Sequence, residues 1–234
     1  MTAPAFVQSN KGSTSSGTNS QQLAFLSNLA LSTHRFITLR QSGASNVITG
    51  VAGSVTGAYG LAATITNLAS TVRLSLWYAE NGAAGAETVV ATTSTTGNSI
   101  RWGILEYSGL LAAASLDFQT SARYTTTTTP ATSSQTTAAD NALCLAFLSA
   151  DTDVTTIVPG GTETSRFTDG VSGNRFEGQD FVKAVAGSVS SSWTCGTSQP
   201  GVYIFAAFKS DTGGGLPTPG YQQYQQRRST IITL

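Results

Sequence analysis

Two segments of the chain carry apolar side chains at odd and even positions alike, which predicts strands that are buried on both faces. The first segment, residues 99–110, reads S-I-R-W-G-I-L-E-Y-S-G-L, and the second, residues 201–209, reads G-V-Y-I-F-A-A-F-K. We expect these two segments to form the centre of the fold. Arg101 and Glu106 lie inside the first segment and need special surroundings there, because a buried charge is costly without partners.

Shorter runs, separated by glycine-rich turns, predict strands along most of the remaining chain. The expected strands cover residues 3–9, 31–40, 46–51, 59–65, 71–79, 87–94, part of 112–124, 139–150, 181–187 and 190–196. Residues 10–20 are expected to be a polar linker or long loop, and residues 160–178 a polar irregular region. A short helix competes with a strand over residues 21–30, and the threonine-rich residues 125–137 predict an exposed strand or loop.

Strands at a spacing of roughly 8–12 residues with glycine-rich turns predict an all-β protein. We expect an antiparallel β-sandwich that is jelly-roll-like, with an immunoglobulin-like sandwich as the alternative. One sandwich domain is expected over residues 1–209, within which residues 1–20 are alternatively an extended N-terminal segment. Residues 210–234 are expected to form a Gly/Pro linker and an extended C-terminal arm. The sequence shows no repeat of fixed period, so we expect no solenoid or propeller.

The chain is poor in charge, with 10% of its residues charged against about 25% in an average soluble domain. Lys plus Arg and Asp plus Glu number 12 each. Capture of nucleic acid requires a basic face, so we expect no nucleic-acid partner. The opening M-T-A-P-A-F lacks the features of a secretory signal, and there is no apolar run of about 18 residues. We therefore expect synthesis in a cytoplasm and no membrane insertion.

The residues that most often bind metals are few. The sequence has two cysteines, Cys144 and Cys195, and one histidine, His34, so no ordinary zinc set can be assembled. Cys144 is expected to be a small buried hydrophobe, and a disulfide to Cys195 is the less favoured alternative. The D-T-D run at 151–153 predicts a capped turn in preference to a calcium site. We expect no metal and no cofactor.

No catalytic constellation is evident, and we expect that the protein is not an enzyme. His34 has no evident nucleophile partner, and no hydrolase G-x-S-x-G motif occurs. Glu106 is expected to meet Arg101 or Arg73, or to lie at a strand end. Polysaccharide cleavage would need two carboxylates in one cleft. The sequence singles out no pair among Asp117, Asp151, Asp153, Glu163, Asp169, Glu177 and Asp180.

Three tryptophans offer aromatic platforms on which a sugar ring can stack. Trp102 lies in an expected core strand, and we predict that it packs in the core. Trp193, flanked by S-S-S and T-C-G, is the better candidate for an exposed glycan-stacking residue.

The C-terminal tail Y-Q-Q-Y-Q-Q-R-R-S-T-I-I-T-L differs from the rest of the chain. Two adjacent arginines can pair with carboxylates of a neighbour, and S-T-I-I-T-L can add as a strand to a sheet edge of another subunit. A disordered or self-packed terminus is the alternative. The expected partner-docking residues are Tyr221, Tyr224, Arg227, Arg228, Ile231, Ile232 and Leu234.

Several motifs occur together and in order: A-F-V-Q-S-N, Y-G-L-A-A, L-W-Y-A-E-N-G-A-A-G, I-L-E-Y-S-G-L and V-Y-I-F-A-A-F-K. As a set they resemble a family of β-sandwich domains found in virion proteins of tailed bacteriophages and in bacterial surface proteins. The resemblance covers about residues 3–209, while residues 31–40 and the tail depart from it. It implies a non-enzymatic structural or adhesive module and carries no catalytic residues.

Two functions follow as expectations. The first is a virion structural protein of a tailed bacteriophage, either a capsid decoration (cement) protein or a tail appendage. Such a protein would be made in the host cytoplasm, form a homo-oligomer, and dock to other virion subunits through its terminal arm. The second is a carbohydrate-binding or adhesion module that recognises a host-surface glycan.

Overall fold

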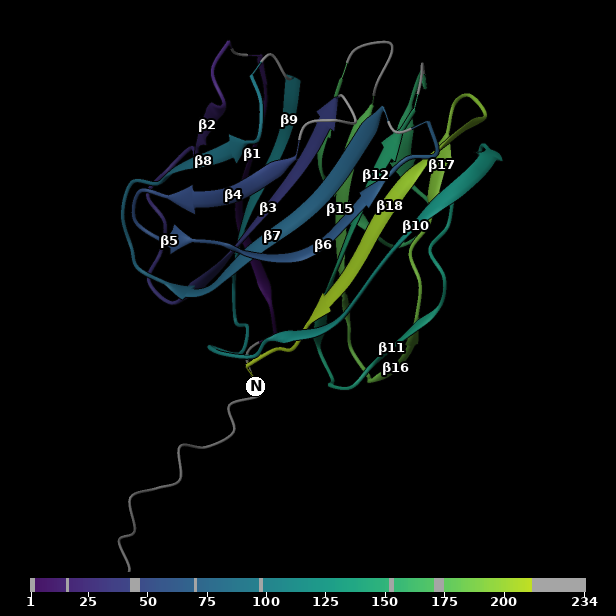
Figure 1. The fold of residues 1–234 in the computed structure, drawn as a ribbon. Coiled ribbons are helices and arrows are strands. Elements are labelled where there is room, and N and C mark those ends of the chain that lie inside the picture. Colours follow the sequence, from purple (N-terminus) through teal and green to yellow (C-terminus); the bar gives the residue numbers. More distant parts are fainter. Residues whose placement is uncertain are drawn as a thin grey trace, which may run out of the picture.

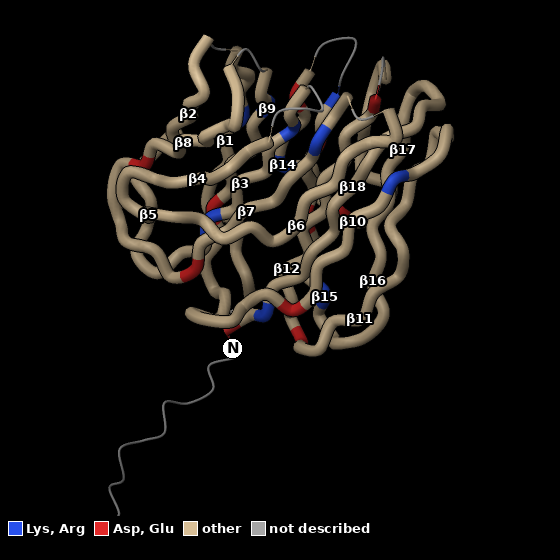
Figure 2. The backbone as a smooth tube through the Cα atoms, in the orientation of Figure 1, with Lys and Arg blue, Asp and Glu red and all other residues tan. Residues whose placement is uncertain are grey.

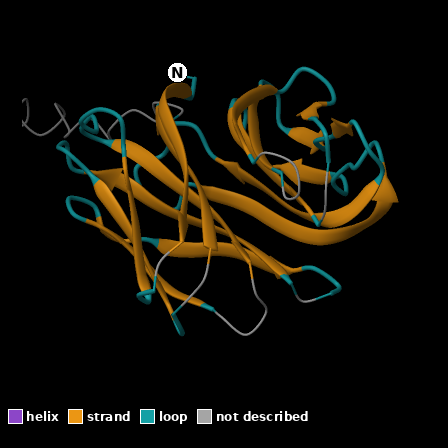
Figure 3. Ribbon diagram, turned by 90° about the horizontal axis from the view of Figure 1, so that it is seen from above, coloured by secondary structure: helices purple, strands orange, loops and turns teal. Residues whose placement is uncertain are grey.

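The computed structural model describes residues 3–15, 17–42, 47–69, 71–96, 99–151, 154–170 and 175–211, and these form strands and loops without a helix (Figures 1 and 3). The first half contains β1 (Ala5–Ser15), β2 (Ser20–Ala24), β3 (Thr33–Ser42), β4 (Ile48–Gly53), β5 (Gly57–Ala58), β6 (Gly60–Thr66), β7 (Val72–Gly82), β8 (Thr88–Thr93) and β9 (Ser99–Ser108). The second half contains β10 (Leu116–Thr127), β11 (Gln135–Thr137), β12 (Ala142–Ala150), β13 (Ile157–Pro159), β14 (Thr164–Asp169), β15 (Phe176–Lys183), β16 (Gly187–Val189), β17 (Trp193–Cys195) and β18 (Gln199–Phe208). All pairings between these strands are antiparallel.

The first half has the strand order of a jelly roll. One sheet has the order β1-β9-β3-β7-β6 and the other the order β2-β8-β4-β5. A jelly roll has eight strands, B to I, in two sheets of order B-I-D-G and C-H-E-F. The B-I-D-G sheet corresponds to strands β1, β9, β3 and β7. The C-H-E-F sheet corresponds to strands β2, β8, β4 and β5. Strand β6 is an addition beside β7.

The second half repeats this arrangement. Its main sheet has the order β10-β18-β12-β15-β14, which matches β1-β9-β3-β7-β6 strand for strand. Strand β11 pairs with β16, and β13 with β17, so β16 and β17 together take the place that β8 has between β2 and β4. The all-β jelly-roll prediction is therefore confirmed over the immunoglobulin-like alternative. The number of sandwiches differs from the prediction, since the described residues form two jelly rolls.

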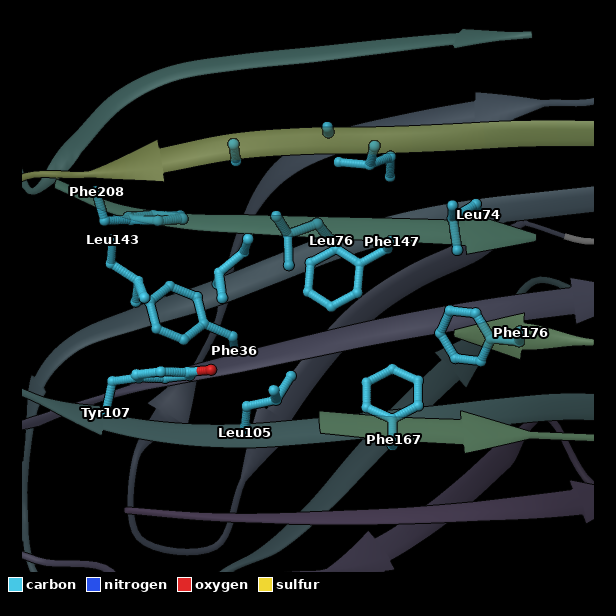
Figure 4. Packing of buried hydrophobic residues seen from close by; sticks show 14 of the residues in the cluster. Phe36, Leu74, Leu76, Leu105, Tyr107, Leu143, Phe147, Phe167, Phe176 and Phe208 are labelled. Carbon is cyan, nitrogen blue, oxygen red and sulfur yellow. The ribbon is translucent and has the colours of Figure 1, made fainter. Parts of the chain in front are cut away.

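The two jelly rolls pack through their five-stranded sheets, with an apolar cluster between them. Phe36 and Leu105 come from the first sheet and Phe147 and Phe208 from the second, and the ring centroids of Phe36 and Phe208 lie 4.6 Å apart (Figure 4). Two further clusters fill the interiors of the separate jelly rolls. The molecule is therefore layered: the β2-β8-β4-β5 sheet comes first, then the two five-stranded sheets, and then the short β11-β16 and β13-β17 ribbons (Figure 1). Because the shared cluster contains side chains of both five-stranded sheets, the two halves share one hydrophobic core.

The two segments predicted to be buried on both faces are strands β9 and β18, and their burial is confirmed. Each is an interior strand in the second place of its sheet, while β3 and β12 are the middle strands. Strand β3 is buried along nearly its whole length although it carries His34, Arg35 and Arg40. Its pairing with β9 on one side and β7 on the other explains this burial.

Two local predictions were wrong in part, and one open alternative is decided by the structure. Residues 10–15 are not a loop, because β1 stays paired with β9 as far as the Ser15–Ser99 position, whereas residues 17–19 lie in neither β1 nor β2. The polar side chains of this region suit an edge strand, which has one free side. Residues 20–24 form a strand and not a helix, and residues 164–169 form β14 within a region expected to be irregular.

Candidate functional site

A cleft of about 400 Å³ opens where an edge of the first jelly roll meets an edge of the second. Its walls come from β1, β9, β12, β14 and β15. Edge strand β1 lies against edge strand β14, and the Ser9 hydroxyl donates a hydrogen bond to the Arg166 carbonyl across this junction at 3.1 Å. The cleft lies at the Tyr107 end of the shared apolar cluster, whose side chains are drawn in Figure 4. The junction of the two jelly rolls therefore creates a cavity that neither contains alone.

The floor of the cleft holds an ion pair. Arg166 Nε lies 2.9 Å from Asp180 Oδ1, and the Tyr107 hydroxyl donates to Asp180 Oδ2 at 2.6 Å. Burial, together with the charge of Asp180, raises the pKa of Tyr107 well above its ordinary value. Burial alone would lower the pKa of Arg166, but Asp180 raises it overall. Arg166 therefore stays charged, and Tyr107 stays a neutral donor to Asp180.

An aromatic ring forms the neighbouring wall. The guanidinium carbon of Arg166 lies 4.1 Å from the centroid of the Phe6 ring, a cation–π geometry. The Tyr107 ring meets the same phenyl ring edge-on, with centroids 5.6 Å apart. Phe6 nevertheless keeps 36% of its surface exposed, which leaves apolar area at the cleft.

Hydrogen-bonding groups remain available around the ion pair. Thr162 and Thr164 line the cleft and are exposed, and their hydroxyls make no hydrogen bond within the described part of the protein. A guanidinium has five N–H donors, so Arg166 keeps donors beyond those that Asp180 and Tyr107 engage. The cleft therefore offers hydroxyls, N–H donors, a carboxylate and an aromatic surface together.

The prediction that Trp193 is an exposed stacking residue is wrong. Its side chain is 1% exposed, and its indole Nε1 donates to Glu177 Oε2 at 2.6 Å. Strand β17 pairs with β13, and this pairing turns Trp193 into the interior of the second jelly roll. Burial raises the pKa of Glu177 to about 8, so that it is mostly protonated at neutral pH. The predicted burial of Trp102 is confirmed.

The partners expected for Glu106 were also wrong. Its Oε1 accepts hydrogen bonds from the Ala30 backbone N–H at 2.8 Å and the Thr33 hydroxyl at 2.6 Å. Its Oε2 accepts one from Gln8 Nε2 at 2.6 Å. Arg101 is paired instead with Asp169, at 2.9 Å. Glu106 therefore ties a loop and an edge strand to the sheet, and is structural as expected.

The cysteines are free and buried, so the alternative of a disulfide between them is wrong. Burial raises the pKa of Cys144 to about 12 and that of Cys195 to about 11. His34 is fully buried, and burial lowers its pKa. In the described ranges no group of three or more His, Cys, Asp or Glu residues is placed to hold a metal ion, and no helix there is long and apolar enough to cross a membrane.

Comparisons of the chain with protein-family models, with curated proteins and with solved structures found no match. The resemblance to phage and bacterial-surface domains therefore stays a hypothesis. The predicted docking residues of the tail, from Tyr221 to Leu234, lie outside the described residues, as do two of the three residues of the D-T-D run at 151–153.

Little in the sequence pattern indicated the cleft. Asp180 was one of seven carboxylates without a distinguishing context, and Arg166 lay in a region expected to be irregular. Phe6 and Tyr107 lie about a hundred residues apart and meet only because β1 pairs with β9. A prediction of that pairing would have been needed to bring them together.

Proposed function

We propose that this protein is a non-enzymatic structural component of a tailed-bacteriophage virion, either a capsid decoration protein or a tail appendage. The observation that carries the proposal is the pair of jelly rolls fused through a shared apolar cluster. Jelly rolls recur in viral capsid and lectin domains, an analogy of fold that supports a structural or adhesive role. A block of this kind keeps its shape when many copies are assembled.

The surface chemistry supports the same proposal. Charged positions are scattered thinly along the backbone (Figure 2), and the hydroxyl-rich composition provides hydrogen bonds without strong repulsion between copies. The proposed docking element is the C-terminal arm, residues 210–234. In a homo-oligomer several arms would bind neighbouring virion subunits together, so that individually weak contacts add up to stable attachment.

A truncation tests the role of the arm. Asp211 donates its backbone N–H to the Gly109 carbonyl at 2.8 Å, and Leu110 bridges to Ser210, so a chain ending at Asp211 keeps these contacts. We expect that this variant folds, as judged by an unchanged thermal unfolding midpoint. It should no longer co-sediment with virus particles that the full chain binds. Undiminished binding by the truncated chain would contradict the role of the arm.

Adhesion to a host-surface glycan is the second candidate function. Trp193 is buried and cannot stack on a sugar. The observation that favours this function is instead the cleft at the junction of the two jelly rolls.

A further inference from the structure

We infer that the cleft between β1 and β14 binds a neutral saccharide through Phe6, Arg166, Asp180 and the hydroxyls of Thr162 and Thr164. The inference concerns the cleft alone and does not depend on the virion assignment. The inferred sugar site is therefore not Trp193 but a cleft that exists only because the two jelly rolls pack together.

The charges of the cleft favour a neutral ligand. Arg166 and Asp180 neutralise each other at 2.9 Å, and the side chain of Asp180 is only 4% exposed. An anionic ligand would compete with Asp180 for Arg166 and be repelled by the carboxylate of Asp180. A cationic ligand would compete with Arg166 for Asp180 and be repelled by the guanidinium of Arg166. A sugar hydroxyl avoids both costs, because it accepts from a guanidinium N–H and donates to a carboxylate oxygen at once.

The apolar part of the cleft suits the C–H face of a sugar ring. Phe6 is 36% exposed and Val182 is 39% exposed, and both line the cleft beside the charged pair. Arg166 and Tyr107 both contact the Phe6 ring, so the aromatic surface is held in place before a ligand arrives. The cleft volume of about 400 Å³ lies within the range of roughly 300–1,000 Å³ that is usual for sites of small ligands.

The walls are also held together independently of any ligand. Ser9 bonds to the Arg166 carbonyl, and Lys11 Nζ donates to the Thr168 carbonyl further along the same junction. These contacts fix β1 against β14, so binding needs little ordering of the protein.

The test is a titration of the full chain with glucose, galactose, mannose and N-acetylglucosamine, with glucuronate as the anionic comparison. Saturation-transfer NMR detects binding, and calorimetry measures the affinity. Phe6→Ala removes the aromatic surface, and Thr164→Val removes an exposed hydroxyl while keeping its shape. Thr125→Val is the matched control, because Thr125 is an exposed threonine on β10, outside the cleft. Thermal unfolding of each variant establishes that it is folded.

We expect saturable binding of at least one neutral sugar in preference to glucuronate. Phe6→Ala should weaken it by about ten-fold, which corresponds to about 1.4 kcal/mol. Thr164→Val should weaken it less, and Thr125→Val should leave it unchanged. The inference is overturned if no neutral sugar binds, if glucuronate binds more tightly, or if folded Phe6→Ala and Thr164→Val proteins bind like the wild type.

Discussion

The indole Nε1 of Trp193 lies 2.6 Å from Oε2 of Glu177, inside the second jelly roll. Both side chains are almost fully buried, so the tryptophan is part of the core and the carboxyl group is held away from water. Burial disfavours the ionised carboxylate, although the hydrogen bond from Trp193 partly offsets this effect. The stability of the second jelly roll should therefore depend on pH.

Glu177→Gln should remove that dependence. The pKa of Glu177 rises from 4.5 to about 8 on folding, so between these values the folded protein holds a proton that the unfolded chain has released. The contribution of this proton to the free energy of unfolding is complete below pH 4.5. It is lost as the pH rises towards 8, because the free energy of unfolding falls by about 1.4 kcal/mol per pH unit in this range. Glutamine keeps an acceptor for Trp193 but does not titrate. Urea unfolding across this pH range measures the difference.

Asp140→Asn is the control, because Asp140 is an exposed carboxylate of the second jelly roll, bonded to the Ala186 backbone N–H, and is not among the groups that act on Glu177. Its replacement should leave the pH slope in place. Equal slopes for the wild type and Glu177→Gln would show that Glu177 does not carry the effect.

Phe167 of β14 packs against two glycines, and this contact joins the jelly rolls. A Cβ atom on Gly103 of β9 would lie 2.1 Å from the Phe167 ring, and one on Gly178 of β15 would lie 2.4 Å from it. Gly103→Ala should therefore destabilise the protein by about 1–3 kcal/mol through overpacking. Chemical denaturation measures this cost.

Two further variants separate overpacking from the conformational effect of removing a glycine. A Cβ on Gly50 of β4 would meet nothing within 4 Å, so Gly50→Ala should be neutral or slightly stabilising. Phe167→Leu combined with Gly103→Ala should cost less than the sum of the two single changes, because the smaller side chain makes room. Strict additivity would exclude the clash as the cause.

Glu106 should hold the loop before β3 in place. Glu106→Gln leaves one acceptor oxygen where there were two, so the bonds from Gln8, Ala30 and Thr33 cannot all be kept, and those that remain go to a neutral amide oxygen and are weaker than bonds to a carboxylate. We expect a loss of about 1–3 kcal/mol in unfolding free energy. Hydrogen exchange at the Ala30 amide should become faster.

Glu80→Gln gives the comparison, because Glu80 accepts bonds from the backbone amides of Ala114 and Ser115 in a different loop. Exchange should then quicken at Ala114 and Ser115 and not at Ala30. Unchanged exchange at Ala30 in Glu106→Gln would contradict the role assigned to Glu106.

The sequence predicted strands best where apolar residues fill both parities, as in β9, β12 and β18. It found the first part of β1, within residues 3–9, and missed the rest, because residues 10–15 are polar and their strand exists only through pairing with β9. It failed at Trp193 for a related reason: the adjacent serines suggested exposure, while the pairing of β13 with β17 buries the side chain. Flanking residues do not reveal such long-range pairings.

The likeness of the two halves and the cleft could not be predicted from sequence patterns, because both depend on the pairing of strands that are far apart in the chain. The two halves share a strand order without a repeat of fixed period, so only the pairing of strands exposes their likeness. Arg166 and Asp180 are 14 positions apart and face each other across β14 and β15. Phe6 reaches them from the start of the chain.

The most direct test of the structural role is to look for the protein in intact particles. Virus particles from a culture in which the chain is naturally expressed would be purified on a density gradient and their proteins quantified by mass spectrometry. A virion component should co-purify with the particles at a constant ratio to the major capsid or tail protein, through repeated gradients. Recovery of the chain only outside the particle fraction would contradict the proposal.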